Sequence, residues 1–362
     1  MVNFMKRVKN LIMFSKCRWF LERTVGSWLR DVVLAAPAAS RLIFHSVSLN
    51  SKPTKVFVMT LFASLHLQAT SLDTVSTLSS KGRYSDALKV LEKLKESKKI
   101  ETDLYHLTKA RVYFSWDKLE DAVSEYSKVP KKSDLWSLSL EERAQSYGRL
   151  KEYDKAVSDL VSVEAPLFNT TRSPEFYFVK GVTHLKTCNF EKVAESLTDF
   201  QIAMDPQIKS LEKIAKGELG AEAMDALKAL AKSEDPSITN YIKVANLLPT
   251  RLHRDQTLMK SLKSSPENVQ NKSVVERLKV LATRSLKEIS RTIDKMQAVK
   301  ADLRQKLAYL EKAEEEGKDR EVVGRIEASK DQLQFPHDGS YWIDEIGYFK
   351  TKMEGCPKEW KL

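Results

Sequence analysis

The stretch KEYDKAVSDLVSV, residues 151–163, carries the pattern on which the fold of this chain depends. A large residue, Tyr153, is followed three positions later by the small Ala156 and four positions after that by Leu160. Spacings of three and four place side chains on one face of an amphipathic helix. The stretch therefore predicts a helix whose buried face has a small residue near its middle.

The same pattern occurs three more times, in Gly82–Leu94, Asp117–Val129 and Cys188–Phe200. The small positions are 35, 34 and 37 residues apart and are occupied by Ala87, Ala122, Ala156 and Val193. A second amphipathic segment lies upstream of each copy, with a small residue three positions before a larger one: Ala110 and Tyr113, Ala144 and Tyr147, Gly181 and His184. A fixed period in this range indicates stacked helix pairs, because one pair cannot bury its apolar face alone.

This repeat resembles the tetratricopeptide repeat (TPR) family, which has a 34-residue period and a signature of a small residue, an aromatic residue and then Ala. The match covers about Leu72–Phe200 and includes the small and aromatic positions named above. The resemblance implies an all-α fold, with a solenoid of helix-turn-helix pairs over residues 70–205. It also implies that the first helix of each pair lines a concave groove that binds a partner.

The family's groove positions can be transferred to this chain residue by residue. They are occupied by Leu104, Leu107, Arg111, Phe114, Gln145, Arg149, Phe178 and Lys186. The third repeat also places Glu141 on this face. Apolar side chains interspersed with three cations suit an extended or helical peptide that carries some negative charge. The alternative is that several of the apolar residues pack against a neighbouring repeat or against the C-terminal helices.

The C-terminal half lacks a clear repeat but keeps a helical pattern. Residues 206–265 are predicted to form degenerate helix pairs. Between Pro266 and Gly317 there is neither Pro nor Gly, and apolar residues recur at spacings of three and four. This predicts a long helix or coiled-coil arm that pairs with Arg320–Leu333, so that residues 266–334 form a helical hairpin. Residues 335–362 are predicted to be an aromatic cap, in which Trp342, Ile346 and Phe349 share one face of a short helix.

The N-terminal 69 residues differ from the rest of the chain. In KPTKVFVMTLFASLHLQATS, residues 52–71, a basic flank leads into an uncharged core of about 12 residues and then into small residues. This core is too short for a membrane span of about 20 residues but suits a signal peptide over residues 47–69. Residues 1–46 have two interpretations: a basic organelle presequence, or a stretch ahead of the true start codon, which we favour.

The net charge of +11 is concentrated at the N-terminus. Residues 1–46 carry eight Lys and Arg against two acidic residues, whereas residues 70–362 carry 50 basic and 47 acidic side chains. A nucleic-acid-binding surface needs a concentrated basic face. The balanced body of the chain therefore argues against nucleic acid as a partner.

Candidate catalytic and metal-binding residues form no recognised arrangement in the sequence. There is no GxSxG, HExxH, P-loop or GxGxxG pattern, and the three cysteines show no metal-ligand spacing. A disulfide between Cys188 and Cys356 is compatible with an oxidising compartment. The sequence leaves this pair and two unpaired thiols equally open.

These observations predict a non-catalytic protein–protein interaction scaffold or adaptor that is exported to the bacterial periplasm or envelope. We expect a protein or peptide partner, no cofactor and no metal, and membrane contact only through the signal segment. The oligomeric state stays unknown. One alternative is an organelle-targeted, mitochondrial TPR adaptor. The other is an enzyme of unrecognised type that uses a C-terminal cluster of His337, Asp338, Asp344 and Glu345.

Overall fold

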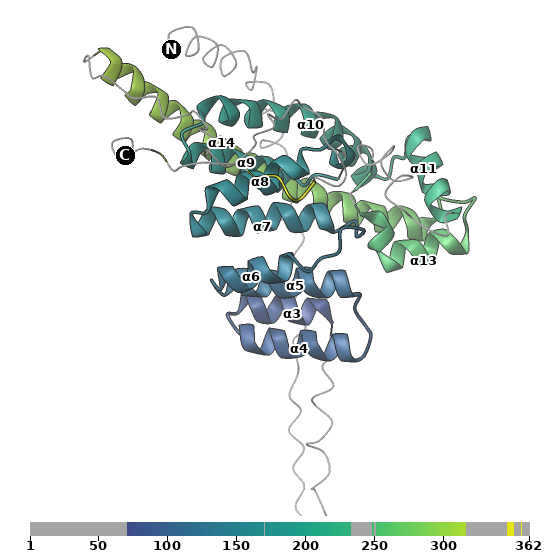
Figure 1. Ribbon diagram of the computed structural model, residues 1–362. Helices are drawn as coiled ribbons and strands as arrows, with labels where there is room; N and C mark the ends of the chain where they lie inside the picture. Colours follow the sequence, from purple (N-terminus) through teal and green to yellow (C-terminus); the bar gives the residue numbers. More distant parts are fainter. Residues whose placement is uncertain are drawn as a thin grey trace, which may run out of the picture. The chain divides into compact units, whose positions relative to one another are not determined.

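The computed structural model describes residues 71–169, 171–232, 248–249, 251–315, 346–350 and 356. Within these ranges the chain is all-α, with no strand and with two short 3₁₀ helices, so the all-helical part of the predicted fold class is confirmed there (Figure 1). The predicted signal peptide and N-terminal extension lie outside the described residues. So do Arg320–Leu333, Trp342 and the proposed C-terminal acidic cluster.

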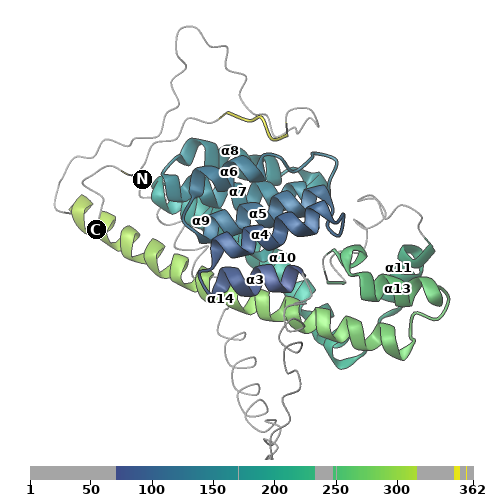
Figure 2. The same cartoon turned by 90° about the horizontal axis from the view of Figure 1, so that it is seen from below.

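Eight helices form four consecutive pairs in which each helix packs against its neighbours in the chain (Figures 1 and 2). The first helices of the pairs are α3 (Leu72–Ser80), α5 (Thr102–Ser115), α7 (Trp136–Leu150) and α9 (Pro174–Lys186). The second helices are α4 (Tyr84–Glu96), α6 (Leu119–Tyr126), α8 (Tyr153–Val163) and α10 (Phe190–Lys216). A 3₁₀ helix, η1 (Pro166–Phe168), lies in the longest connection between pairs.

The turn inside each pair has the same backbone conformation. One residue adopts a positive φ at each turn: Gly82 (72°), Asp117 (63°), Lys151 (64°) and Cys188 (56°). The second helix begins two residues later, at the large residue of the sequence pattern. Asp117, Lys151 and Cys188 are not glycine, so the left-handed backbone conformation costs about 1–2 kcal/mol at each of these three residues. Helix packing must offset this cost.

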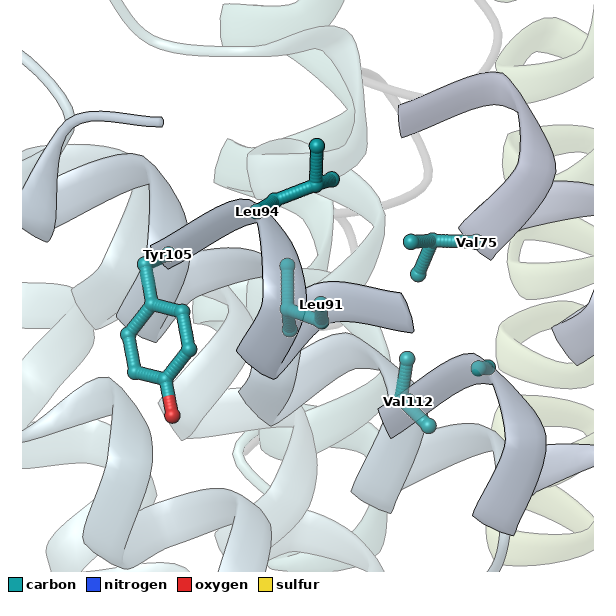
Figure 3. Close-up of a cluster of buried hydrophobic side chains, with 6 residues drawn as sticks. Val75, Leu91, Leu94, Tyr105 and Val112 are labelled. Carbon is teal, nitrogen blue, oxygen red and sulfur yellow. The ribbon is translucent and has the colours of Figure 1, made fainter. Parts of the chain in front are cut away.

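The small residues of the pattern lie in the interior between packed helices. Ala87, Ala122, Ala156 and Val193 are completely buried, as are Ala110 and Ala144 on the preceding helices. The first core cluster joins α3, α4 and α5 through Val75, Ala87, Leu91, Leu94, Tyr105 and Val112. Figure 3 draws this cluster as sticks and labels Val75, Leu91, Leu94, Tyr105 and Val112. Packing among α3, α4 and α5 therefore builds this part of the core.

The helix α10 does not end at Pro206, where the sequence suggests a boundary. The whole helix is 27 residues long and runs past the proline to Lys216, and Met204, Ile208, Leu211 and Ile214 stay buried. Pro206 has no N–H to donate to the carbonyl of Ile202. Ile202 is 68% exposed, so water can solvate that carbonyl while the buried face continues past the proline.

The long C-terminal helix, α14 (Lys272–Glu315), packs against α9 and α10. It begins after a turn at residues 265–271 rather than at Pro266, and the side chain of Asn271 accepts a hydrogen bond from Ser273 N at 3.1 Å. Gly181 of α9 lies beside Val299, whereas Gly217 at the end of α10 lies beside Lys279. Ser196 near the start of α10 also lies beside Gly181, so α10 and α14 run antiparallel. The predicted second arm of the hairpin lies outside the described residues.

Three shorter elements precede α14 in the chain, and one of them packs against it. They are α11 (Ala221–Lys232), the 3₁₀ helix η2 (Leu252–Arg254) and α13 (Gln256–Ser264), and α13 contacts the other two as well as α14. Asp255 caps α13 by accepting a hydrogen bond from Leu258 N at 2.8 Å, and it also pairs with Arg277 of α14. This one carboxylate therefore fixes α13 against the long helix.

The described part of the C-terminal segment is docked but not helical. Ile346 is 2% exposed and packs with Ala165, Phe168 and Trp136. Gly347 turns the chain at φ 88°, and residues 348–350 have no helical assignment. The predicted short helix through Phe349 is therefore wrong, because the left-handed turn at Gly347 breaks it. A disulfide joins Cys356 to Cys188.

Candidate functional site

The predicted groove residues lie on α5, α7 and α9, the first helices of three successive pairs. On α5, Leu107 is 1% exposed and belongs to a core cluster with Ala110 and Tyr126, while Leu104 and Phe114 are partly buried against the same cluster. Leu107 therefore holds α5 against α6 and does not face a partner.

Arg111 joins α5 to α7 through a two-pronged ion pair with Glu142. Its Nε donates to Glu142 Oε2 at 2.8 Å, and its Nη2 also reaches the carboxylate. Desolvation alone would lower the pKa of Arg111, but the neighbouring carboxylate outweighs it and raises the pKa. The side chain as a whole is still 47% exposed. Gln145, one turn further along α7, is half-buried.

Arg149 makes a similar but more exposed connection. Its Nη2 lies 2.6 Å from Asp117 Oδ1, and its guanidinium lies 4.8 Å from the ring centre of Phe114. Arg149 is 44% exposed and Asp117 is 74% exposed. An ion pair between such exposed groups contributes about 0–1 kcal/mol, so another carboxylate can replace Asp117 at little cost.

The α9 part of the predicted groove is covered by α14. Lys295 of α14 lies 5.0 Å from the ring centre of Phe178 and pairs with Glu175 at 2.6 Å. Lys186 is exposed at the other end of α9, and its carbonyl accepts a hydrogen bond from Cys356 N at 3.0 Å. The structure thus places Phe178 under the chain's own long helix, which agrees with the alternative of internal packing.

Glu141, which the repeat pattern places on the groove face, is instead a buried carboxyl group that connects α7 to α9. It is 2% exposed and accepts hydrogen bonds from Ser173 N at 3.2 Å and from Ser173 Oγ at 2.5 Å. Burial raises the pKa of Glu141 to about 7, although the bonds from Ser173 and the charge of Arg251 oppose this shift. Ser173 also caps α9, so Glu141 positions the start of that helix.

A basic segment, Arg251–Arg254, docks against acidic residues at the starts of α5 and α7. Arg254 Nε lies 2.9 Å from both oxygens of Asp134, and its Nη2 lies 2.7 Å from Asp103 Oδ2. His253 Nε2 lies 2.8 Å from Asp134. Burial alone would raise the pKa of Asp134, but His253 and Arg254 outweigh it and lower that pKa. Sequence reasoning missed this network because its partners are 120 residues apart.

In the part of the chain that the structure describes, no three or more His, Cys, Asp and Glu side chains are grouped so as to hold a metal ion. None of the helices there combines the length and apolar character that crossing a membrane requires. No protein-family model matches this chain, and no curated protein or solved structure is significantly similar to it.

Proposed function

We propose that this protein is a non-catalytic adaptor or scaffold built from TPR-like helix pairs, and that it binds an acidic segment of a partner protein across α5 and α7. The observation that carries the proposal is that the side chains of Arg111 and Arg149, on the first helices of consecutive pairs, are 47% and 44% exposed. Phe114 lies beside Arg149 and adds an aromatic surface between the two helices.

The bound segment would interact with these residues unequally. Arg149 is the main contact, because its exposed pair with Asp117 can exchange with a partner carboxylate. Arg111 is engaged by both oxygens of Glu142 and offers only its remaining exposed edge. Because α14 contacts α9 and covers Phe178, the proposed surface is limited to α5 and α7. This is a shorter surface than the eight predicted residues would form.

Reversing the charge of Arg149 tests this surface. The variant Arg149→Glu is expected to weaken binding of the partner about tenfold or more, since a hydrogen bond to a charged group contributes about 1.5–3 kcal/mol. The partner would be identified by crosslinking in the envelope fraction, and its affinity for the purified protein measured by biolayer interferometry. Lys155→Glu is the matched control, because it makes the same charge change at an exposed position of α8. Equal losses in both variants would contradict the proposed surface.

We further propose that the protein is exported and acts in the periplasm or at the envelope. The disulfide between Cys188 and Cys356 supports an oxidising compartment, where such bonds persist. The basic flank and short apolar core of residues 47–69 support a cleaved signal peptide.

The processing of the N-terminus tests the proposed compartment. N-terminal sequencing of the protein from its native source is expected to begin near Thr70. A mature protein that begins at Met1 would contradict export through this signal. So would one that begins near residue 46, where removal of an organelle presequence would leave its first residue.

A further inference from the structure

The C-terminal segment is attached to the repeat helices at two described points. The first is residues 346–350, where Ile346 enters a socket formed by Trp136, Ala165 and Phe168, which we call the Trp136 socket. The second is Cys356, which is bonded to Cys188 in the turn between α9 and α10. Cys356 lies ten residues beyond Ile346 in the chain.

The first attachment fits closely but is small. Gly347 N donates to Ser162 Oγ at 2.8 Å, and Lys131 Nζ donates to the carbonyl of Ile346 at 3.1 Å. Lys131 also lies 3.9 Å from the ring centre of Tyr348, which is itself 68% exposed. A Cβ atom on Gly347 would lie 2.8 Å from Trp136 Cζ2, so only glycine fits this turn.

Contacts of this size do not hold a chain segment by themselves. Burial of Ile346 contributes about 1.5–3 kcal/mol and each of the two hydrogen bonds about 1 kcal/mol. Together they do not offset the conformational entropy of about 5–10 kcal/mol that is lost when five residues are ordered. A covalent link ten residues away makes docking intramolecular and raises the effective concentration of Ile346 at its socket. The second attachment point therefore decides whether the first is occupied.

We propose that the Cys188–Cys356 disulfide is a redox-controlled tether that keeps the C-terminal segment over the Trp136 socket. Both cysteines are partly exposed, so a dithiol reductant can reach them while the helices stay folded. A thiolate of the reductant attacks one cysteine sulfur, the S–S bond breaks, and the second thiol of the reductant resolves the mixed disulfide. Two electrons and two protons pass to Cys188 and Cys356, and the reductant is oxidised to its own disulfide. Ile346 then leaves, and the apolar socket is uncovered.

Hydrogen exchange of the full chain, followed by mass spectrometry, tests the tether. Cys17→Ser serves as the background, so that Cys188 and Cys356 are the only cysteines. With dithiothreitol as the dithiol, the amides of residues 346–350 are expected to exchange at least tenfold faster than in the oxidised protein. The amides of α7 and α8 are expected to keep their protection, and reoxidation is expected to restore the slow exchange.

Two variants separate the effect of the tether from that of the socket contacts. The pair Cys188→Ser and Cys356→Ser is expected to show fast exchange at residues 346–350 both with and without dithiothreitol. Gly347→Ala is expected to show fast exchange at residues 346–350 even with the disulfide intact. The added Cβ atom would collide with Trp136 and keep Ile346 out of the socket. Slow exchange at residues 346–350 after reduction would overturn the proposal, since the contacts alone would then hold the segment. Equal loss of protection in α7 and α8 would also overturn it, since the bond would then stabilise the whole fold.

Discussion

Replacing Gly181 with leucine is expected to lower the free energy of unfolding by about 3 kcal/mol or more, the upper end of the cost of overpacking a core. Gly181 lies where α9, α10 and α14 meet. A Cβ atom at this position would lie 3.3 Å from Val299 Cγ1 and 3.6 Å from Ser196 Oγ. Leucine adds three further carbon atoms to this space, which forces α14 away from α9. Urea denaturation of the purified protein measures the loss.

The alanine variants at two helical glycines provide the matched control. A Cβ atom on Gly148 of α7 would have only Thr183 Oγ1 nearby, at 4.0 Å, so Gly148→Ala is expected to stabilise the protein by up to about 1 kcal/mol. Gly181→Ala has the same helix-propensity gain, but Val299 must move by a few tenths of an ångström. We therefore expect it to be close to neutral. A Gly181→Leu variant with wild-type stability would contradict the close approach of the three helices.

The contact of α14 with α9 and α10 also covers part of the predicted groove. The repeat pattern predicts a face open to a partner over α5, α7 and α9, yet α14 packs against α9 and covers Phe178. The chain thus fills part of this face itself. A partner can reach the proposed surface with α14 in its present position, because the side chains of Arg111 and Arg149 are half-exposed there.

The local features of the fold could be predicted from the sequence because they depend on short spacings. The first residues of four helices, Tyr84, Leu119, Tyr153 and Phe190, are the large residues that open the repeated pattern. Ala87, Ala122 and Ala156 are buried, as small residues between stacked helices should be. Helical spacing requires only knowledge of the residues within one or two turns.

Long-range contacts could not be predicted in this way. The apolar stripe of α14 indicates a helix with one buried face, but the stripe is the same whether the partner is a returning hairpin arm or α10. Asp134 and Arg254 are 120 residues apart in the chain, and nothing in the sequence around either residue distinguishes it from an ordinary surface charge. For the same reason the repeat pattern places Glu141 on the groove side of α7, whereas its hydrogen bonds to Ser173 place it in the interior.

That interior position leads to the second large effect, a dependence of stability on pH. Burial raises the pKa of Glu141 from 4.5 to about 7, so between these pH values the folded protein binds more protons at this site than the unfolded chain does. The contribution of Glu141 to stability therefore falls as the pH rises from about 4.5 to 7. Above pH 7 the charged carboxylate costs about 3 kcal/mol relative to the protonated form.

His184 acts in the opposite direction over an overlapping range. It is 7% exposed, and burial lowers its pKa from 6.5 to about 3, with the charges of Lys180 and Lys192 adding to the shift. The unfolded chain binds the extra proton here, so the contribution of His184 to stability falls as the pH drops from 6.5 towards 3. Between pH 4.5 and 6.5 the two slopes largely cancel in the wild-type protein.

Glu141→Gln is expected to expose this cancellation. The amide keeps an acceptor for Ser173 N and a donor for Ser173 Oγ but does not titrate, so stability should now rise steadily from about pH 4.5 to 6.5. At about pH 8 the variant should exceed the wild type by up to about 3 kcal/mol, and at about pH 4 the difference should nearly vanish. Urea denaturation at several pH values measures both effects, with the surface substitution Glu152→Gln as the control. The prediction is wrong if the free energies of unfolding of the variant and the wild type differ by the same amount at the lowest and the highest pH. Glu141 would then not titrate with a raised pKa, and an ionised carboxylate would connect α7 to the start of α9.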